Sequence, residues 1–390
     1  MSPGIALRGR CAAWPIALSS ILLGFAGCGG ITQGGTVQAP SPTSVTVSCA
    51  PTTVAPGATA QCSATVQGGS AAVTWTVSAG TMNSSGLFTA PSSTGQVSVK
   101  ATSVAAAQVS GTTAITVAYL VAPSKHVVLV MEENQSYSTV VGNTTDWPAL
   151  NALIGKGSLA TNYYANTHPS IGNYFMLTTG QILTNDDTST EVWNVDNIAR
   201  RMLSSGVSFK IYAEGISQGY TGGDTGLYVI RHNPFAMLSD IANNAQVASE
   251  VMFPFTQFAL DVQNNALPEF SFIVPNIDDD AHTGTALEAD SWLGSQVVAP
   301  LAGLSAFQAG GDGILVVDFD EADDSDTTNG GGHVAPVLWG PNVKAGYQQN
   351  SATVYQHQSM LLAIMDALGL GDPPGASANA PSMGEFFVQQ

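Results

Sequence analysis

The chain has 390 residues and a hydrophobic content of 44%, which is enough to fill the cores of more than one domain. Its 28 acidic and 10 basic residues give a net charge of −18 and a pI near 4.3. Such a surface repels the nucleic-acid backbone and anionic lipid headgroups. We therefore expect no nucleic-acid partner.

The first 28 residues are typical of an export signal. Arg8 and Arg10 precede an apolar stretch over residues 11–25, which is too short to span a membrane. It ends in Phe25-Ala26-Gly27-Cys28, which resembles a bacterial lipobox, so a lipid on Cys28 would anchor the protein. Cleavage without lipidation is the alternative. The sequence predicts a periplasmic, outer-membrane-anchored or secreted protein that contacts membrane only through this lipid.

Residues 29–42 read as a flexible tether, and residues 43–118 as an all-β sandwich. The tether is rich in Gly, Thr, Gln, Ser and Pro and almost free of apolar residues. The next segment alternates Val and Thr with polar residues between Gly, Pro and Ser turns, which is the pattern of short sandwich strands. Cys49 and Cys62 are the pair left after export, and we expect a disulfide, with two buried thiols as the alternative. Trp75 is expected to pack over them.

The VTWTVS and GLFTAP segments of this block resemble bacterial immunoglobulin-like modules of exported enzymes. The resemblance implies a spacer, or a module that contacts cell-surface material. It implies no catalytic group.

After a linker over residues 119–124, residues 125–390 predict an α/β domain with a central, mostly parallel sheet. Apolar runs that indicate buried strands occupy residues 125–134, 206–215, 270–277, 313–321 and 333–341. Helices are expected near residues 146–155, 173–180, 196–205, 255–264, 287–307 and 359–368. In such a domain the functional groups collect beyond the carboxyl ends of the strands.

Polar clusters follow three of these strands. Glu132, Glu133 and Asn134 close the first, where carboxylate and amide oxygens suit a divalent cation, although a polar loop is the commoner use of such residues. The segment VVDFDEADDSD ends another, and its carboxylates must repel one another unless a cation or protons neutralise them. The run from Asp278 to His282 follows a third, with a spacing that can supply an oxygen and an imidazole to one ion. An acidic loop without metal is an equal alternative there, and Asn276 is a further candidate.

The segment THPSIGNY places Ser170 at or just before a predicted helix. Amides at a helix N-terminus and a neighbouring metal would both stabilise a serine alkoxide there. A plain N-cap serine is the commoner role for this residue type. Asn173 has an amide that can face a phosphoryl oxygen, and His168 is placed either to protonate a leaving group or to contact the loop. His333 and His357 are ambiguous, and a structural role is expected for at least one.

Taken in order, these clusters resemble the phosphoesterase family of bacterial and fungal acid phosphatases and bacterial phospholipases C, a branch of the alkaline-phosphatase-like fold. The matching segments are VVLVMEEN, THPSIGNY, PNIDDDAH, VVDFDE and the terminal helix YQHQSMLLAIMDALGL, so the resemblance covers residues 125–370. It implies an alkaline-phosphatase-like α/β sandwich.

The resemblance also implies roles for individual residues. Glu133, Asn134, Asp320 and Glu321 would bind a divalent ion of unknown identity, Ser170 would be the nucleophile, and Asn173 would hold the phosphoryl group. Weaker counterparts would serve a second metal, protonation or phosphate contact, and these are Asp280, His282 and His357. The departure is Gly172, where the family usually has proline.

The sequence therefore predicts an exported, metal-dependent hydrolase that cleaves phosphate monoesters through a phosphoserine. Two alternatives stay open. One is a phosphodiesterase of the phospholipase C type, and the other is a surface-binding lipoprotein that has lost catalysis. The domain has few aromatic clusters that could engage a bilayer, which favours a phosphatase over a phospholipase C.

Overall fold

A computed structural model describes residues 40–389 of the chain. The predicted signal segment, the lipobox with Cys28 and nearly all of the tether lie outside this range. Within the described part, no helix has the length and apolar character needed to cross a bilayer.

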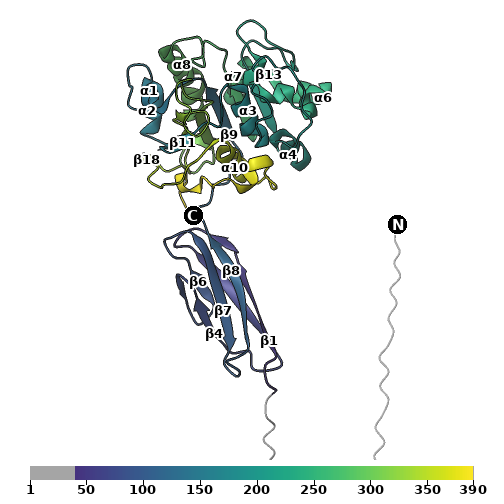
Figure 1. Cartoon of the computed structure of the whole chain (residues 1–390), viewed down its shortest axis with the longest axis vertical. Helices are drawn as coiled ribbons and strands as arrows, with labels where there is room; N and C mark the ends of the chain where they lie inside the picture. The colour runs from purple at the N-terminus through teal and green to yellow at the C-terminus, as the bar shows by residue number, and fades with distance from the viewer. Residues whose placement is uncertain (1–39, 390) are drawn as a thin grey trace, which may run out of the picture. The chain divides into compact units, whose positions relative to one another are not determined.

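Residues 44–117 form two four-stranded sheets around one small core, drawn in purple and blue in Figure 1. One sheet has the strand order β1-β3-β6-β5 and the other β2-β8-β7-β4. The strands are β1 (Ser44–Ala50), β2 (Thr53–Val54), β3 (Thr59–Gln67), β4 (Val73–Val77), β5 (Thr81–Met82), β6 (Leu87–Thr89), β7 (Gly95–Ser103) and β8 (Ser110–Val117). Every second side chain of β1 is buried, as the alternating sequence predicts.

The sandwich contains the predicted disulfide between Cys49 and Cys62. The two cysteines lie directly opposite each other on the antiparallel strands β1 and β3. Trp75, on the other sheet, packs against the same core, as expected. These observations show a β-sandwich, and its assignment to the immunoglobulin-like class stays a prediction.

The α/β domain is built on an eight-stranded sheet with the order β13-β12-β14-β9-β15-β17-β10-β18. The five strands from β13 to β15 are parallel, and β17 runs antiparallel to β15. A separate two-stranded ribbon pairs β11 with β16. The strands are β9 (Val127–Glu132), β10 (Ser158–Leu159), β11 (Tyr163–Tyr164), β12 (Phe209–Ala213), β13 (Met252–Pro254), β14 (Phe270–Val274), β15 (Ile314–Phe319), β16 (His333–Val334), β17 (Val337–Trp339) and β18 (Tyr347–Gln348).

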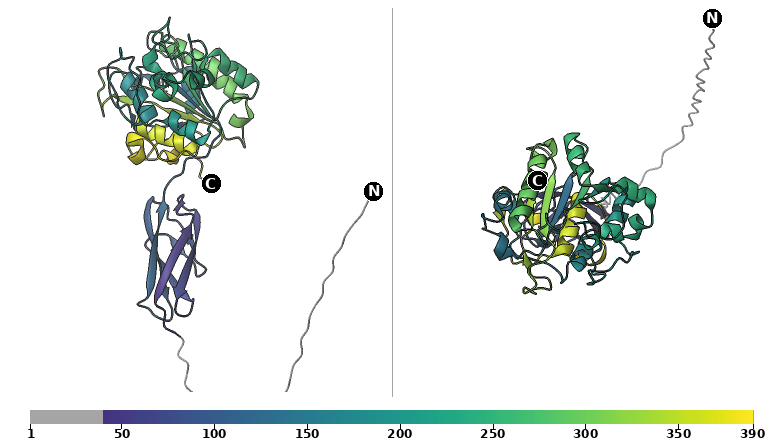
Figure 2. Two further views of the ribbon diagram at one scale, coloured as in Figure 1. Left: turned by 90° about the vertical axis from the view of Figure 1, so that its right-hand side faces the viewer. Right: turned by 90° about the horizontal axis from the view of Figure 1, so that it is seen from above.

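Helices cover both faces of this sheet, as the end-on view in Figure 2 shows. They are α1 (Tyr137–Val140), α2 (Pro148–Ile154), α3 (Ile171–Thr179), α4 (Ile198–Ser205), α5 (Ser239–Ala242), α6 (Ala245–Val251), α7 (Thr256–Gln263), α8 (Ala286–Trp292), α9 (Ala299–Ala302) and α10 (His357–Ala367). Shorter turns are η1 (Ile230–His232), η2 (Pro234–Met237), η3 (Leu293–Val298, a π-helix), η4 (Ser305–Phe307), η5 (Gly375–Asn379) and η6 (Gly384–Phe386). Helices α3, α4 and α10 pack together, and α2, α8 and α9 belong to a second group with η3.

The central strands are buried on both faces, which explains their continuous apolar sequences. All six residues of β9 and all six of β15 are buried, and so are the five of β14. Each of the five predicted strand segments contains a strand, and five of the six predicted helices lie within two or three residues of their expected bounds. The α/β class and the mostly parallel centre of the sheet are therefore confirmed.

Two long predictions were wrong in detail. The segment at residues 333–341 splits into β16 and β17, which belong to different sheets, because Pro336 between them has no amide hydrogen to donate to a ladder. The helix expected over residues 287–307 is interrupted by the π-helix η3 and by the turn at η4. The short elements β13 and α5 were not expected, because their sequences are too short to show a period, and α6 was missed as well.

Candidate active site

The polar clusters meet at one edge of the sheet, where β14, β9 and β15 end side by side. Because these strands are parallel neighbours, their carboxyl ends lie at the same edge. Backbone hydrogen bonds continue past the strands: the amide of Glu133 donates to the carbonyl of Asp280, and that of Asp320 donates to the carbonyl of Glu132. The topology thus brings together residues that are nearly 200 positions apart.

Ser170 lies at the start of α3, buried against these strand ends. Its Oγ donates a hydrogen bond to Oε2 of Glu133 at 3.0 Å, and only 2% of the residue is exposed. Tyr174, one turn further along α3, donates to the other oxygen of the same carboxylate at 2.6 Å. The Ser170 hydroxyl also acts to lower the pKa of Asp320 and Glu321, against the larger effect of burial. The predicted nucleophile therefore sits among three of the predicted metal ligands.

Asn134 turns the chain at the end of β9. Its φ is 55°, in the left-handed region that asparagine tolerates better than most residues. In this conformation its amide donates to Oδ1 of Asp320 at 3.0 Å, and its side-chain Nδ2 donates to Oε2 of Glu133 at 3.2 Å. The structure places Glu133, Asn134, Asp320 and Glu321, four of the six predicted metal ligands, at this edge, and their role as ligands stays a prediction.

The carboxyl groups of Glu133, Asp320 and Glu321 are buried close enough together that their negative charges would repel one another. Burial, followed by the charges of Asp320 and Asp280, raises the pKa of Glu133 well above its usual value. Burial raises the pKa of Asp320 to about 7, and burial with the charges of Asp320 and Asp187 raises that of Glu321 to about 10. Oδ2 of Asp320 is buried with no hydrogen-bond partner. A divalent cation fits this donor set, since it would neutralise the carboxylates and engage the unpaired oxygen.

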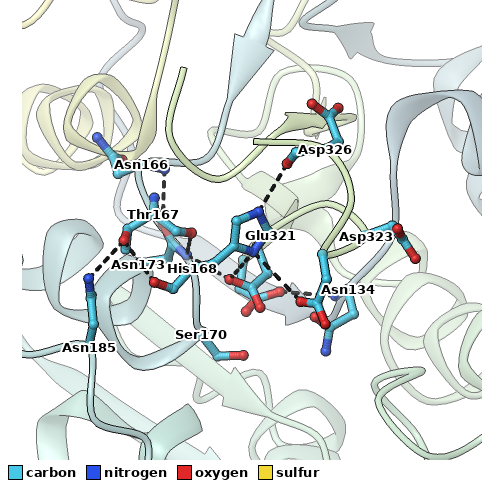
Figure 3. A network of polar contacts seen from close by, with 12 residues as sticks. Asn134, Asn166, Thr167, His168, Ser170, Asn173, Asn185, Glu321, Asp323 and Asp326 are labelled. Carbon is cyan, nitrogen blue, oxygen red and sulfur yellow. Dashed lines mark hydrogen bonds and ion pairs between the residues drawn. The ribbon is translucent and has the colours of Figure 1, made fainter. Parts of the chain in front are cut away.

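His168 connects the nucleophile loop to the end of β15, as Figure 3 shows. Its Nδ1 lies 3.0 Å from Oε2 of Glu321, and its Nε2 lies 3.0 Å from the backbone carbonyl of Asp326. A carbonyl accepts only, so Nε2 carries the proton and Nδ1 faces the carboxyl group. Nδ1 also lies 4.0 Å from the exposed Asp324, so these three side chains form one possible metal cluster.

Asn173 fixes the loop before the nucleophile. Its Oδ1 accepts from the amides of Asn166 and Thr167, and its Nδ2 donates to the carbonyl of Thr167 at 2.8 Å. The same nitrogen lies 3.4 Å from Oε2 of Glu321. The residue is in the site, as predicted, but its amide is used to hold the loop. This geometry favours positioning of Ser170 over direct phosphoryl contact.

His232 is a member of the site that the sequence did not reveal. It is 1% exposed, with Nδ1 3.0 Å from Oδ2 of Asp280 and Nε2 3.1 Å from Oε1 of Glu133. Burial lowers its pKa to about 3, so the ring is neutral. It lies in η1, which follows no strand of the sheet, so a search of strand ends misses it. The chain has only six histidines, and their small number was the one signal in the sequence that could have pointed to it.

His282 extends this cluster toward the solvent. Its Nε2 is 3.3 Å from Nη2 of Arg231 and so accepts from it, while its Nδ1 is buried without a hydrogen-bond partner. Ligand atoms of Glu133, His232 and His282 lie within 4.8 Å of one another, which makes a second possible metal cluster. Asp280, with a pKa that burial raises to about 7, accepts from the amide of His282. The site therefore includes Asp280 and His282, as predicted.

The pairing of Asp278 with His282 on one ion was wrong. Asp278 is exposed, and its Oδ1 accepts a hydrogen bond from Thr283. Asn276 points to Glu214 and Asp279, to both of which its Nδ2 donates. The chain turns after β14, where the amides of Asp279 and Asp280 both donate to the carbonyl of Asn276, and this turn leaves Asp278 exposed and Asp280 buried in the site.

His357 stands behind the site, not in it. Its Nε2 is 2.7 Å from the carbonyl of Asp320, and its Nδ1 is 3.1 Å from the hydroxyl of Tyr163 and 3.5 Å from Asp318. Both nitrogens are thus occupied by protein groups, which argues against the predicted metal ligation. His333 is stacked between Tyr137 and Tyr164, a structural role.

The geometry of His232 leads to a testable expectation. Because it holds Glu133 from the side opposite Ser170, His232→Ala is expected to weaken metal affinity by about tenfold to a hundredfold, as loss of such supporting contacts does. His232→Gln keeps a polar group in place and is expected to recover part of that affinity. Titration calorimetry with the full chain measures both, and unchanged affinity in His232→Ala would contradict this role.

Residues 143–371 match the Phosphoesterase family. The chain belongs to this family. Among its relatives, a phosphatidylinositol-3-phosphatase of Mycobacterium tuberculosis is 29% identical over 67% of this chain and 82% of that protein. An acid phosphatase of Aspergillus fumigatus is 30% identical over 56% of this chain and 50% of that protein. The protein is accordingly a hydrolase that acts on phosphate esters.

The chain spans between 50% and 57% of the length of its fungal relatives. Among solved structures, an alkaline phosphatase superfamily protein from Vibrio parahaemolyticus is similar with a TM-score of 0.44 and 13% identity, over 68% of this chain and 72% of that one. The membership of this chain in the Phosphoesterase family rests on the sequence match.

Proposed function

We propose that this protein is a metal-dependent phosphomonoesterase that works through a phosphoserine at Ser170. The observation that carries the proposal is the hydrogen bond from Ser170 Oγ to Glu133 within a buried group of three carboxyl groups. A buried serine hydroxyl that meets a carboxylate has a proton acceptor at hand, and the start of α3 supplies amides that favour developing negative charge. A plain N-cap role is disfavoured, since the Ser170 side chain caps no amide of α3.

Glu133, Asn134, Asp320 and Glu321 would hold the divalent ion. A divalent cation there supplies positive charge that polarises the phosphoryl group and favours the serine alkoxide. The donors are oxygens, which suits several divalent ions. An alkaline-phosphatase-like fold is part of the same proposal.

Glu133 and solvent account for the proton movements. Ser170 Oγ attacks phosphorus while its proton passes to Oε2 of Glu133, and the ester bond to the alcohol breaks. The alcohol oxygen takes a proton from solvent as it leaves. His282 is not the donor, because its Nε2 accepts from Arg231 and burial lowers its pKa, so the neutral ring accepts a proton more readily than it gives one. Water then attacks the phosphoserine and releases a proton to solvent, and Glu133 returns its proton to the serine oxygen as phosphate leaves.

A monoester is favoured over a phospholipid diester as substrate. The relatives are named as phosphatases, including the phosphatidylinositol-3-phosphatase and the fungal acid phosphatases. These names support a phosphomonoester for this chain as well.

The test is hydrolysis of p-nitrophenyl phosphate by the full chain, after chelation and after single metals are added back. We expect activity to vanish with chelator and to return with one ion, and p-nitrophenyl phosphorylcholine to be cleaved far more slowly. Preference for the choline diester would replace the phosphatase with a phospholipase C. Failure of both substrates with every ion would leave a surface-binding protein.

We also propose export, with a lipid on Cys28. The basis is the signal-like sequence of residues 1–28. Mass measurement of the mature N-terminus tests it: a diacylglyceryl mass on Cys28 is expected, and an unmodified N-terminus would contradict lipidation. Contact of the β-sandwich with cell-surface material stays a prediction.

A further inference from the structure

The connection between α3 and α4 brings a carboxylate to the proposed phosphoryl site. Asp187 Oδ1 accepts a hydrogen bond from the amide of Ile171 at 3.1 Å. Ile171 is the first residue of α3 and directly follows Ser170. This amide is therefore one of those that would otherwise favour negative charge on a group attached to the serine.

The other oxygen of Asp187 faces Arg231. Oδ2 lies 3.8 Å from Arg231 Nε, and that nitrogen is buried without a hydrogen-bond partner. The Arg231 side chain is 16% exposed and is bonded to His282 through Nη2. The charge of Asp187 also acts on Glu321, His232 and His282, since it raises the pKa of each against or alongside the larger effect of burial. Asp187 is thus an electrostatic member of the site.

A tight turn places the side chain of Asp187 between the Ile171 amide and Arg231. Oδ1 of Asp186 accepts from the amide of Thr188 at 3.0 Å and from its hydroxyl at 2.6 Å, which closes a tight turn with Asp187 at its corner. The side chain of Asp187 is 31% exposed, so solvent reaches it.

Gly172 makes room for this connection. A Cβ at Gly172 would lie 2.4 Å from Oδ1 of Asn185 and 2.6 Å from Cγ2 of Thr167. Asn185 in turn donates to the hydroxyl of Thr167 at 3.0 Å, which ties the connection to the nucleophile loop (Figure 3). The glycine that departs from the family's usual proline is therefore the residue over which the Asp187 segment packs.

We propose that Asp187 is a specificity residue that selects singly charged over doubly charged phosphoryl groups. The proposal rests on the proposed function of the site. With the Asn173 amide engaged in the loop, the Ile171 amide and the Arg231 guanidinium are groups suited to bind phosphoryl oxygens, and Asp187 contacts both. A carboxylate fixed between them repels a phosphoryl dianion more strongly than a monoanion.

The substrate class follows from this charge rule. A phosphomonoester carries close to two charges at neutral pH and one below its second pKa near 6, whereas a diester carries one throughout. Among phosphomonoesters, Asp187 therefore favours the monoanion and penalises the dianion that predominates at neutral pH.

Asp187→Asn tests the proposal at one fixed pH of 7.5, because asparagine keeps an oxygen for the Ile171 amide and removes the charge. We expect kcat/KM for p-nitrophenyl phosphate to rise about fivefold, as for a partly exposed charge pair. The kcat/KM for methyl p-nitrophenyl phosphate, which is a monoanion, is expected to stay within about twofold of the wild-type value, because the removed charge acts on one ligand charge instead of two. Asp186→Asn, in the same turn, is the matched control and is expected to leave the ratio of the two values unchanged.

Direct binding separates this proposal from the proposed function. By calorimetry of the metal-loaded full chain, inorganic phosphate is expected to bind Asp187→Asn about fivefold more tightly than the wild type, and the affinity for dimethyl phosphate is expected to change by no more than about twofold. This readout needs no turnover, so a protein that hydrolyses neither ester but shows the shift would overturn only the proposed reaction. Equal or weaker phosphate binding in Asp187→Asn would show that Asp187 orients Arg231 instead, and would overturn the selection role.

Discussion

Replacing Ser170 with alanine is expected to lower kcat for p-nitrophenyl phosphate by roughly 10³-fold or more, the usual cost of losing a nucleophile. Metal affinity is expected to stay within about threefold of the wild type, because the hydroxyl contacts the carboxyl groups without being their main hydrogen-bond donor. Glu133 keeps the hydrogen bonds from Tyr174 and Asn134, and Asp320 keeps the one from the Asn134 amide. Initial rates and metal titration on the same preparation check both statements.

Two further measurements make this result specific to a covalent mechanism. Ser291→Ala removes an exposed helical hydroxyl that bonds only its own helix, and it is expected to leave the rate unchanged. Acid quenching of the wild type during turnover is expected to trap phosphate on the peptide that contains Ser170. Full activity in Ser170→Ala, or a label found on another residue, would contradict the phosphoserine.

The fold was predictable because its central strands are buried on both faces. A short, continuous apolar run such as the one in β15 is typical of a strand covered by helices on both sides. A glycine that ends a helix in the left-handed conformation, as Gly180 and Gly206 do, marks the helix boundary clearly. Short elements such as α5 carry too few residues to show a period.

The site residues were predictable only where an acidic side chain directly follows a strand of the sheet. Glu133, Asp320 and Asp280 follow parallel neighbours, so their meeting point follows from topology. His232 and Asp187 lie in long connections, and their positions depend on turns that no periodicity reports. Their contacts with Glu133 and Ile171 are properties of the folded chain alone.

The role of each residue in the site was harder to predict than its presence there. Asn173 lies in the site and His357 stands behind it, but the amide of Asn173 mainly holds the loop backbone, and His357 bonds the carbonyl of Asp320 and the hydroxyl of Tyr163. A motif fixes a residue type at a position, whereas the partners of its side chain depend on the surrounding loop. The same limit applies to Asp278, which a turn directs to solvent.

Removing the metal is expected to make the protein less stable as pH rises. Burial raises the pKa of Asp320 to about 7 and that of Glu321 to about 10, against ordinary values near 4. At a pH above the ordinary pKa values and below the raised ones, the folded state therefore binds more protons than the unfolded chain. The free energy of unfolding then falls as pH rises. The loss is expected between about pH 4 and pH 7 for Asp320 and to continue toward pH 10 for Glu321.

Saturating metal is expected to reverse this trend. A divalent cation neutralises the carboxylates that protons neutralise in its absence, so it stabilises the protein most where those groups would otherwise be charged. We expect the metal-free Tm to fall by about 5 °C or more between pH 5 and pH 8, and added metal to restore it at pH 8. Calorimetric scans with chelator and with each ion measure both curves. A metal-free Tm that rises over this range would contradict the assignment.

Asp320→Asn distinguishes charge repulsion from general damage to the site. Asparagine retains an oxygen for the amide of Asn134 and removes one of the buried negative charges. At pH 8 the metal-free variant is therefore expected to be more stable than the metal-free wild type, although it has lost a proposed ligand. Added metal is expected to stabilise the variant far less than the wild type. A substitution that stabilises the metal-free fold and abolishes the response to metal indicates a carboxylate that is present to bind a cation, because replacing a residue kept for packing alone would destabilise the fold.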